Sequence, residues 1–203
     1  MTMNLKIDNL AKSYPGRPVF KDISATVESE KSLVVTGPNG SGKTTLLRII
    51  CGFIRPGRGS VTLKMEQSEV SGIEIRPYVG LVSPDLVLYD ELTAIENLRF
   101  FGDVAGLGIA DAEFENRLSK LGLMNRGRDK VGSYSSGMKQ RLKYCLALLR
   151  NPKLLLLDEP TSNLDEAGKE MVSEIIRSFD GIVVIATNEK AELEYGDQII
   201  RLS

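Results

Sequence analysis

The chain has 203 residues, of which 42% are apolar and 26% are charged. A chain of this length forms one large domain or two small ones, and its apolar share is sufficient for a buried core. Its 26 basic and 27 acidic side chains leave a net charge of −1, which argues against binding nucleic acid through bulk positive charge and against a polybasic membrane anchor. The sequence contains no histidine, so no mechanism here uses an imidazole as a base or metal ligand.

The two cysteines, Cys51 and Cys145, both lie in apolar helical patterns. We therefore expect buried free thiols rather than a disulfide or a zinc site. The first residues, MTMNLKIDNL, contain no apolar signal core, and no run approaches the roughly 18 apolar residues that a membrane span needs. The composition thus predicts a soluble, cytosolic chain.

Short runs with β-branched or leucine-rich cores predict strands at residues 4–10, 19–28, 32–36, 59–64, 78–82, 153–157, 182–186 and 197–202. Helical patterns occur at residues 43–51, 93–102, 110–121, 135–150 and 166–179. Thr93 and Glu96 have the spacing of a capping box at the start of the second helix, and Gly52 is suited to end the first in a left-handed conformation.

Three of the predicted strands, SLVVTG, KLLLLDE and GIVVIAT, are continuously apolar. Such runs are typical of a parallel sheet whose two faces are covered by helices. Strands cluster at the two ends of the sequence, while helices dominate from about 90 to 150, which favours one α/β domain over residues 1–203 with a helical insertion. We expect the sheet of this domain to be mainly parallel.

The strongest chemical pattern is G-x-x-x-x-G-K-T at residues 37–44, which follows the apolar run LVVT and opens the helix TTLLRII. Its glycines let backbone N–H groups converge on phosphate oxygens, and the helix start contributes the positive end of its dipole. Lys43 is expected to reach the β- and γ-phosphates, and the Thr44 hydroxyl to ligate Mg²⁺. The predicted nucleotide-binding residues are Gly37, Pro38, Asn39, Gly40, Ser41, Gly42, Lys43, Thr44 and Thr45.

A second pattern, LLLLDEP at residues 154–160, is a buried strand that ends in two carboxylates. Such a strand places them at the carboxyl edge of the sheet, where open α/β sheets bind their ligands. Asp158 is expected to hold Mg²⁺, directly or through water. Glu159 is then placed to polarise the attacking water, a role that the lack of histidine leaves open.

Together with these patterns, the segment YSSGMKQR at residues 134–141 resembles the signature of ATP-binding cassette (ABC) proteins, Leu-Ser-Gly-Gly-Gln followed by x-Gln-Arg. Residues 162–165 (SNLD) resemble the D-loop of that family, and Tyr14 is similar to its adenine-stacking aromatic residue. The resemblance covers nearly the whole chain. It implies a P-loop NTPase fold with a smaller antiparallel sheet formed by residues from about 1 to 30 and from about 59 to 82, and with a helical subdomain at about 90–150.

The resemblance also implies that Ser135, Ser136 and Gly137 of one subunit contact the γ-phosphate held by another, with Asp165 in the same region. A serine at a helix start is also a good N-cap, and the two roles are compatible because a helix start attracts anions. The same helix carries Lys139, Arg141 and Lys143, which we interpret as a solvated face, with contact to a partner as the alternative. The helical insertion as a whole is expected to be the docking surface for a partner.

Two positions depart from the family pattern. The stretch GLVSPDLVLY at residues 80–89 has no glutamine where the family has one that contacts Mg²⁺ and the lytic water. Ser83 or Asp85 could take its place, but the proline between them cannot. Asn188 stands where the family has a switch histidine, and its amide can donate a hydrogen bond to a γ-phosphate oxygen but cannot carry positive charge.

The resemblance implies an ATP-binding and ATP-hydrolysing subunit, with Glu159, Lys43 and Asn188 as catalytic residues and with hydrolysis slowed by the two departures. Such subunits act as homodimers or heterodimers that power a separate integral membrane transport subunit. The variant signature looks most like haem-exporter or drug-exporter types. The chain would then be cytoplasmic and held at the inner face of the membrane by its partner. The alternatives are a soluble ABC ATPase with a non-membrane partner and an ATP-driven switch with weak hydrolysis.

Overall fold

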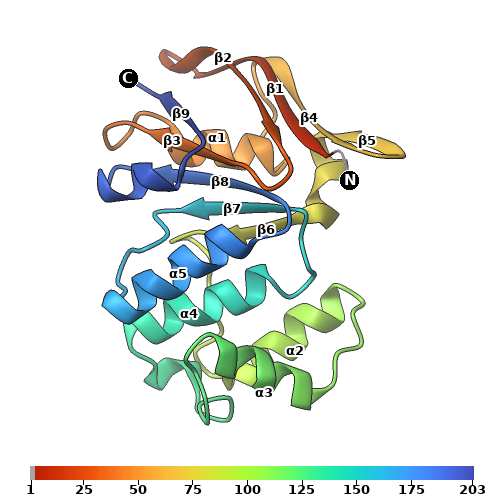
Figure 1. Ribbon diagram of the computed structural model, residues 1–203, viewed down its shortest axis with the longest axis vertical. Helices are drawn as coiled ribbons and strands as arrows, with labels where there is room; N and C mark the ends of the chain where they lie inside the picture. Colours follow the sequence, from red (N-terminus) through yellow and green to blue (C-terminus); the bar gives the residue numbers. More distant parts are fainter. Residues whose placement is uncertain (1–2) are drawn as a thin grey trace.

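The computed structural model describes residues 3–203, and the smaller of its two sheets is antiparallel (Figure 1). This sheet consists, in spatial order, of β2 (Arg17–Glu28), β1 (Asn4–Tyr14), β4 (Arg58–Met65) and β5 (Ser68–Ser71). The short β5 was not predicted, because its sequence Ser-Glu-Val-Ser has almost no apolar content. Such short polar strands are typical of sheet edges.

The prediction that this sheet extends to residue 82 is wrong. Antiparallel pairing ends at Ser71, and Gly72–Tyr78 form a short 3₁₀ helix. Gly72 has φ +55°, and Pro77 lacks a backbone donor, so the chain turns out of the sheet at this point. The next strand, β6 (Val79–Val82), pairs with the larger sheet instead.

The larger sheet is parallel and consists, in spatial order, of β6, β7 (Leu154–Asp158), β8 (Ile182–Thr187), β3 (Ser32–Thr36) and β9 (Gln198–Arg201). Every residue of β7 and β8 is buried, which confirms the prediction of strands covered on both faces. Because the strands are parallel, the carboxyl ends of β3, β7 and β8 lie at one edge of the sheet.

Successive residues of these strands face two separate cores. On one face, Leu155 and Leu157 pack in a core formed mainly with the helical layer of Figure 1, whose members are α2 (Ala94–Val104), α3 (Asp111–Lys120), α4 (Ser136–Ala147) and α5 (Glu166–Ser178). On the other face, Leu154 and Leu156 pack with α1 (Lys43–Ile50) and the antiparallel sheet. The predicted α/β fold, with its antiparallel sheet and helical insertion, is confirmed.

Several local predictions are also confirmed. Thr93 and Glu96 form the capping box of α2, with each backbone N–H donating to the other side chain. Gly52 has φ +72° just after α1. Both cysteines are buried and free. Within residues 3–203, no helix is both long and apolar enough to span a membrane.

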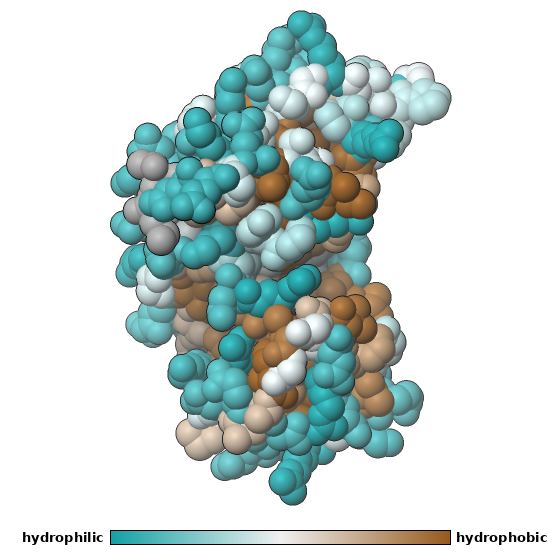
Figure 2. Space-filling model, turned by 90° about the vertical axis from the view of Figure 1, so that its right-hand side faces the viewer, coloured by the Kyte–Doolittle hydropathy of each residue, from teal (hydrophilic) through white to brown (hydrophobic). Residues whose placement is uncertain are grey.

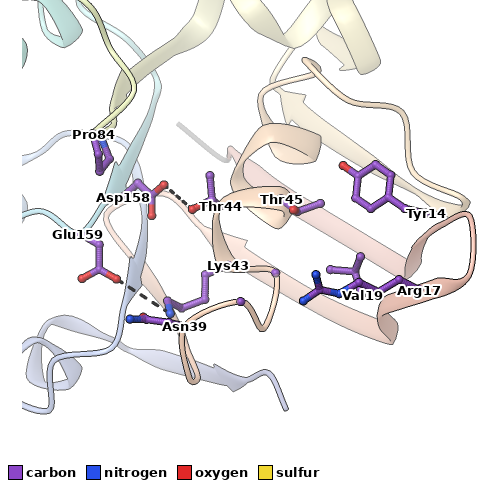
Figure 3. A pocket seen from close by; sticks show the side chains of 12 residues that line it. Tyr14, Arg17, Val19, Asn39, Lys43, Thr44, Thr45, Pro84, Asp158 and Glu159 are labelled. Carbon is purple, nitrogen blue, oxygen red and sulfur yellow. Dashed lines mark hydrogen bonds and ion pairs between the residues drawn. The ribbon is translucent and has the colours of Figure 1, made fainter.

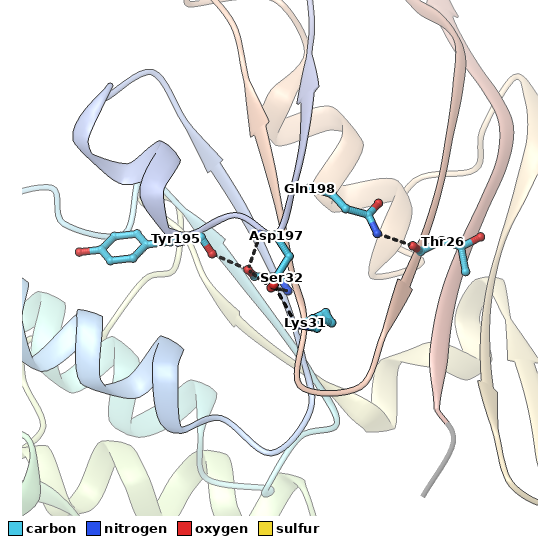
Figure 4. A network of polar contacts seen from close by, with 6 residues as sticks. All are labelled: Thr26, Lys31, Ser32, Tyr195, Asp197 and Gln198. Atoms are coloured by element: carbon cyan, nitrogen blue, oxygen red, sulfur yellow. Dashed lines mark hydrogen bonds and ion pairs between the residues drawn. The ribbon is translucent and has the colours of Figure 1, made fainter.

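A polar network fixes the C-terminal segment against the start of β3 (Figure 4). The Asp197 carboxylate accepts hydrogen bonds from the Ser32 backbone N–H at 2.9 Å and from the Lys31 ammonium at 3.0 Å. The Ser32 hydroxyl donates to the Tyr195 carbonyl. The hydrogen bond from the Ser32 backbone lowers the pKa of Asp197. The network therefore anchors the end of the short 3₁₀ helix Ala191–Tyr195 to the parallel sheet.

Candidate functional site

A cavity of about 410 Å³ lies at the carboxyl edge of the parallel sheet (Figure 3). Nine of its twelve lining residues are among those predicted from the sequence: Tyr14, Asn39, Gly40, Gly42, Lys43, Thr44, Thr45, Asp158 and Glu159. The other three are Arg17, Val19 and Pro84. Arg17 and Val19 belong to β2, so the antiparallel sheet forms one wall of the cavity and the ends of α1 and β7 form the other.

The loop between β3 and α1 has the conformation that the glycine-rich pattern predicts. Gly40 and Gly42 have φ +82° and +100°, and a Cβ on Gly42 would lie 2.4 Å from a Val19 methyl carbon. The Ser41 hydroxyl is buried and lacks a hydrogen-bond partner within residues 3–203. Because an unpaired buried hydroxyl costs roughly 1–3 kcal/mol, its position at this loop fits a phosphate oxygen as acceptor.

Lys43, the first residue of α1, is only 6% exposed. Its ammonium donates to the carbonyl oxygens of Gly37 at 2.8 Å and Pro38 at 3.3 Å. It also lies 4.0 Å from a carboxylate oxygen of Glu159. The ammonium is therefore held inside the loop, next to the carboxyl end of β7, where a phosphate bound by the loop would meet it.

Thr44 and Asp158 bring two oxygen atoms together at the base of the cavity. The Thr44 hydroxyl donates to the Asp158 carboxylate at 2.7 Å (Figure 3). Burial raises the pKa of Asp158, against the opposing effects of the Thr44 hydrogen bond and Lys43. Within residues 3–203 no group of three or more His, Cys, Asp or Glu side chains is arranged to hold a metal ion. Two protein oxygens beside a phosphate loop fit Mg²⁺, which completes its shell with waters and substrate phosphates.

Glu159 has a strained backbone, with φ +51°. Its backbone N–H donates to the Ala186 carbonyl at 2.9 Å, and its side chain is partly buried. Burial raises the pKa of its carboxyl, and Lys43 opposes that shift. A non-glycine residue in this region of φ costs about 1–2 kcal/mol, and such strain is concentrated at functional sites.

Asn188 lies beside the phosphate loop although it does not line the cavity. It comes directly after β8, and its side-chain amide donates to the Asn39 side-chain oxygen at 3.0 Å. The structure thus brings the predicted switch position next to the loop. It does so through parallel pairing of β8 with β3, in which Thr187 lies opposite Thr36.

The signature and D-loop residues lie outside this cavity. Ser135 is the N-cap of α4, with its hydroxyl accepting from the Met138 N–H at 3.2 Å. Asp165 is the N-cap of α5 and accepts from the Gly168 N–H at 2.9 Å. A Cβ on Gly137 would lie 3.1 Å from the Asn163 carbonyl, so the start of α4 packs closely against the D-loop.

The prediction that the basic residues of α4 form a solvated face is wrong. Lys139 pairs with Asp90 at 2.7 Å, and Arg141 pairs with Asp165 at 3.0 Å. Lys143 donates to the carbonyl oxygens of Ser83 and Pro84 at 3.1 and 2.9 Å. These contacts hold α4 against segments that are distant in the sequence, which periodicity along one helix does not reveal.

The segment after β6 supplies the cavity with a proline and no polar side chain. Pro84 lines the cavity, whereas Ser83 and Asp85 do not. The Ser83 hydroxyl accepts from the Asp85 backbone N–H, and the Asp85 carboxylate pairs with Arg48 of α1. Neither proposed substitute for the missing glutamine is therefore brought to the cavity.

Known proteins are similar to this chain over most of its length. The family model described as ABC transporter matches residues 20–162. The ABC transporter ATP-binding protein YdbJ of Bacillus subtilis (strain 168) is 37% identical over 194 residues, which cover 94% of this chain and 63% of YdbJ. The lantibiotic transport ATP-binding protein SrtF of Streptococcus pyogenes is 35% identical, with 94% of this chain and 82% of SrtF covered. The chain thus spans less than two thirds of YdbJ.

A solved structure agrees with these sequence relatives. The dimeric, post-hydrolysis state of the ATP-binding cassette MJ0796, bound to ADP and Pi, has a TM-score of 0.84 and 25% sequence identity. The match covers 98% of this chain and 94% of that one.

The backbone strain at Glu159 can be measured. Glu159→Gly and Glu159→Ala both remove the carboxylate, but only glycine adopts φ near +51° without strain. We expect the glycine variant to have the higher free energy of unfolding, by about 1 kcal/mol in urea denaturation. The same pair of changes at Glu170, inside α5, should give the opposite order, by a similar amount. Equal stability of the two Glu159 variants would contradict the strain.

Proposed function

This chain belongs to the ABC transporter family, and on that premise we propose that it is an ATP-binding and ATP-hydrolysing subunit that powers a separate membrane transport subunit. One observation carries the proposal: Lys43, the Thr44–Asp158 pair and Glu159 all meet in one cavity. A phosphate loop, two oxygens that suit Mg²⁺ and a carboxylate beside them are the components that ATP hydrolysis requires.

In this proposal the glycine-rich loop binds the phosphates of ATP and Tyr14 binds its base. Tyr14 lines the cavity and is 45% exposed. The Lys12 ammonium lies 5.1 Å from the centre of its ring, on one face, and the adenine stacks on the other. Stacking does not distinguish base edges, so GTP should compete with ATP.

Thr44 and Asp158 would hold Mg²⁺, which neutralises charge that develops on the β- and γ-phosphates. Lys43 contributes a second positive charge from inside the loop. Glu159, whose pKa is raised by burial, accepts a hydrogen bond from the water that attacks the γ-phosphorus. Asn188, held next to Asn39, donates one neutral hydrogen bond where the family has a histidine. Hydrolysis is therefore slow.

A second copy of the chain completes the site. Ser135, Ser136 and Gly137 lie at the start of α4, outside the cavity of their own chain, and a helix start attracts anions. In a dimer, this segment contacts the γ-phosphate held by the other copy. The dimeric form of the ATP-binding cassette MJ0796 supports this arrangement.

An apolar groove supports a membrane partner. The groove has a volume of about 260 Å³. Its mostly apolar lining includes Leu81 of β6, Leu86 after it, Phe101 and Val104 of α2, and Leu146 of α4. Val104 is 75% exposed, although its side chain is apolar. On the face shown in Figure 2, apolar side chains lie at the surface in the upper half and also in the lower half, at the level of the helical layer of Figure 1. Such a surface suits an apolar helix or loop of a partner protein.

The segment after β6 connects this groove to the nucleotide cavity. Pro84 lines the cavity and Leu86, two residues further on, lines the groove. Lys143 of α4 holds the carbonyl oxygen of Pro84 at 2.9 Å. A partner seated in the groove would therefore respond to closure of the nucleotide site. SrtF is a lantibiotic transport ATP-binding protein, and this likeness supports a transport role. In this proposal the transporter is an exporter, and the chain lies at the cytoplasmic face of the membrane.

A switch with weak hydrolysis is the second candidate function. Asn188 stands where the family has a histidine, which can be positively charged, and Pro84 occupies the cavity wall where the family has a glutamine. Both changes leave ATP binding intact and weaken only the chemical step. In this alternative, ATP closes the dimer and opens it again without rapid turnover.

Nucleotide binding is tested by calorimetric titration. Lys43→Ala should abolish ATP binding or weaken it severely, because a charge-assisted phosphate contact is lost. Lys64→Ala, an exposed change on β4, is the matched control and should bind as the wild type does. Tyr14→Ala should lose about 1–3 kcal/mol of binding free energy, and Tyr14→Phe, which keeps the ring, should lose little. Unchanged affinity in Lys43→Ala would refute the phosphate site.

Phosphate release at saturating ATP separates the two functions. Glu159→Gln should barely turn over ATP, while Glu166→Gln, an exposed change in α5, should not affect kcat. Asn188→Ala should lower kcat by about tenfold, as expected for one hydrogen bond. Asn188→His should raise kcat without lowering KM, because its added contact acts in the transition state. Equal rates of phosphate release for the wild type and Glu159→Gln would exclude the proposed hydrolysis and leave the ATP-driven switch as the function.

A further inference from the structure

A buried carboxylate lies next to the catalytic segment, and no step of the proposed mechanism uses it. Glu192, in the 3₁₀ helix Ala191–Tyr195, is 3% exposed. One of its oxygens accepts hydrogen bonds from both the backbone N–H, at 3.2 Å, and the hydroxyl of Thr161. The other oxygen is buried and has no hydrogen-bond partner within residues 3–203. Burying a carboxylate with so few partners is costly, which points to a role beyond packing.

Thr161 belongs to the turn that follows β7 and begins with Glu159. The Ser162 backbone N–H donates to the Glu159 carbonyl at 3.2 Å, and the Leu164 N–H to the Thr161 carbonyl at 3.1 Å. The turn therefore runs directly from the strained Glu159 to the D-loop. A residue keeps a strained φ only when its surroundings fix it from several sides.

The turn is held on two sides by different elements. From α4, the buried Tyr144 hydroxyl donates to the Pro160 carbonyl at 2.9 Å, and the Gln140 amide donates to the same oxygen at 3.4 Å. From the 3₁₀ helix after β8, Glu192 holds Thr161. The 3₁₀ helix that carries Glu192 is itself anchored, because the Ser32 hydroxyl donates to its last carbonyl, that of Tyr195 (Figure 4).

We propose that Glu192 is a positioning residue for hydrolysis: by holding Thr161, it fixes the turn that aims the Glu159 carboxylate at the attacking water. This inference rests on the proposed ATPase function. Glu192 follows Asn188 by four positions, so the segment after β8 contributes both to the phosphate loop and to the turn at Glu159. Glu192 does not line the nucleotide cavity, and in this proposal it acts through its hydrogen bonds with Thr161.

Steady-state kinetics of three Glu variants test this role. Glu192→Ala removes the acceptor and should lower kcat by about tenfold, as expected for a lost hydrogen bond, while the Kd of ATP from calorimetry stays within about twofold of the wild type. Glu192→Gln keeps an acceptor oxygen for Thr161 and should restore kcat to within about threefold of the wild type. Glu194→Gln, an exposed change in the same 3₁₀ helix, is the matched control and should not alter kcat.

Thr161→Val gives an independent measure of the same contact, because it removes the hydroxyl and nearly keeps the side-chain volume. It should lower kcat without changing the Kd of ATP, and adding it to Glu192→Ala should cause no further loss, since both act through one contact. If Glu192→Ala does not fold, Thr161→Val and Glu192→Gln provide the test. Additive losses, or a kcat in Glu192→Gln as low as in Glu192→Ala, would overturn the role assigned to the Thr161 contact.

The result also distinguishes a positioning role from a purely structural one. If Glu192 only stabilised the fold, its removal would lower ATP affinity together with kcat, and that outcome would overturn the proposal. An active wild type whose kcat is unchanged in Glu192→Ala and Thr161→Val would overturn this inference alone. A wild type no faster than Glu159→Gln would instead overturn the proposed hydrolysis, and this inference with it.

Discussion

The parallel pairing of β7, β8 and β3 positions the phosphate loop, Glu159 and Asn188 of the candidate site. In this pairing Asp158 lies opposite Ala186, and Thr36 lies opposite Thr187, so three strands end at one edge within neighbouring positions. The phosphate loop, Glu159 and Asn188 each follow one of these strands directly. The pairing itself follows from continuously apolar sequences that are buried on both faces, because such strands are stable only inside a sheet covered by two layers.

The site concentrates features that disfavour folding. Lys43 and Asp158 are 6% and 4% exposed, and Glu159 has φ +51°. Opposite charges and hydrogen bonds offset part of this cost: Lys43 lies near Glu159, and Thr44 donates to Asp158. The strained backbone and the buried charges lie at one edge of the sheet, and the regular core elsewhere keeps the domain folded. This distribution is expected where catalysis requires features that lower stability.

Much of the fold and the phosphate site was predictable because the signals are local. The glycine-rich loop, its flanking strand and helix, and the two carboxylates after β7 are each contained in a short segment of sequence. A buried strand also fixes where its last residue lies, at the carboxyl edge of the sheet. Those predictions therefore required no knowledge of which segments meet in space.

The remaining features depend on contacts between distant segments. Val19 of β2 packs against Gly42, and Lys143 of α4 donates to the carbonyl of Pro84. The sequence around Val19 and Lys143 does not indicate either contact. Glu192 lies in a charged stretch typical of an exposed helix, yet it is buried against Thr161, 31 positions earlier. Side chains of this kind acquire their roles from tertiary structure, and periodicity along one element does not reveal them.

The proposed function requires two copies of the chain to close on ATP, with Ser135–Gly137 of each copy completing the site of the other. Sedimentation velocity of Glu159→Gln tests this directly, because that variant should retain bound ATP. We expect a dimer in Mg-ATP and a monomer in Mg-ADP, since only ATP supplies a γ-phosphate for the start of α4. A monomer in both nucleotides, under conditions where calorimetry shows ATP bound, would contradict it.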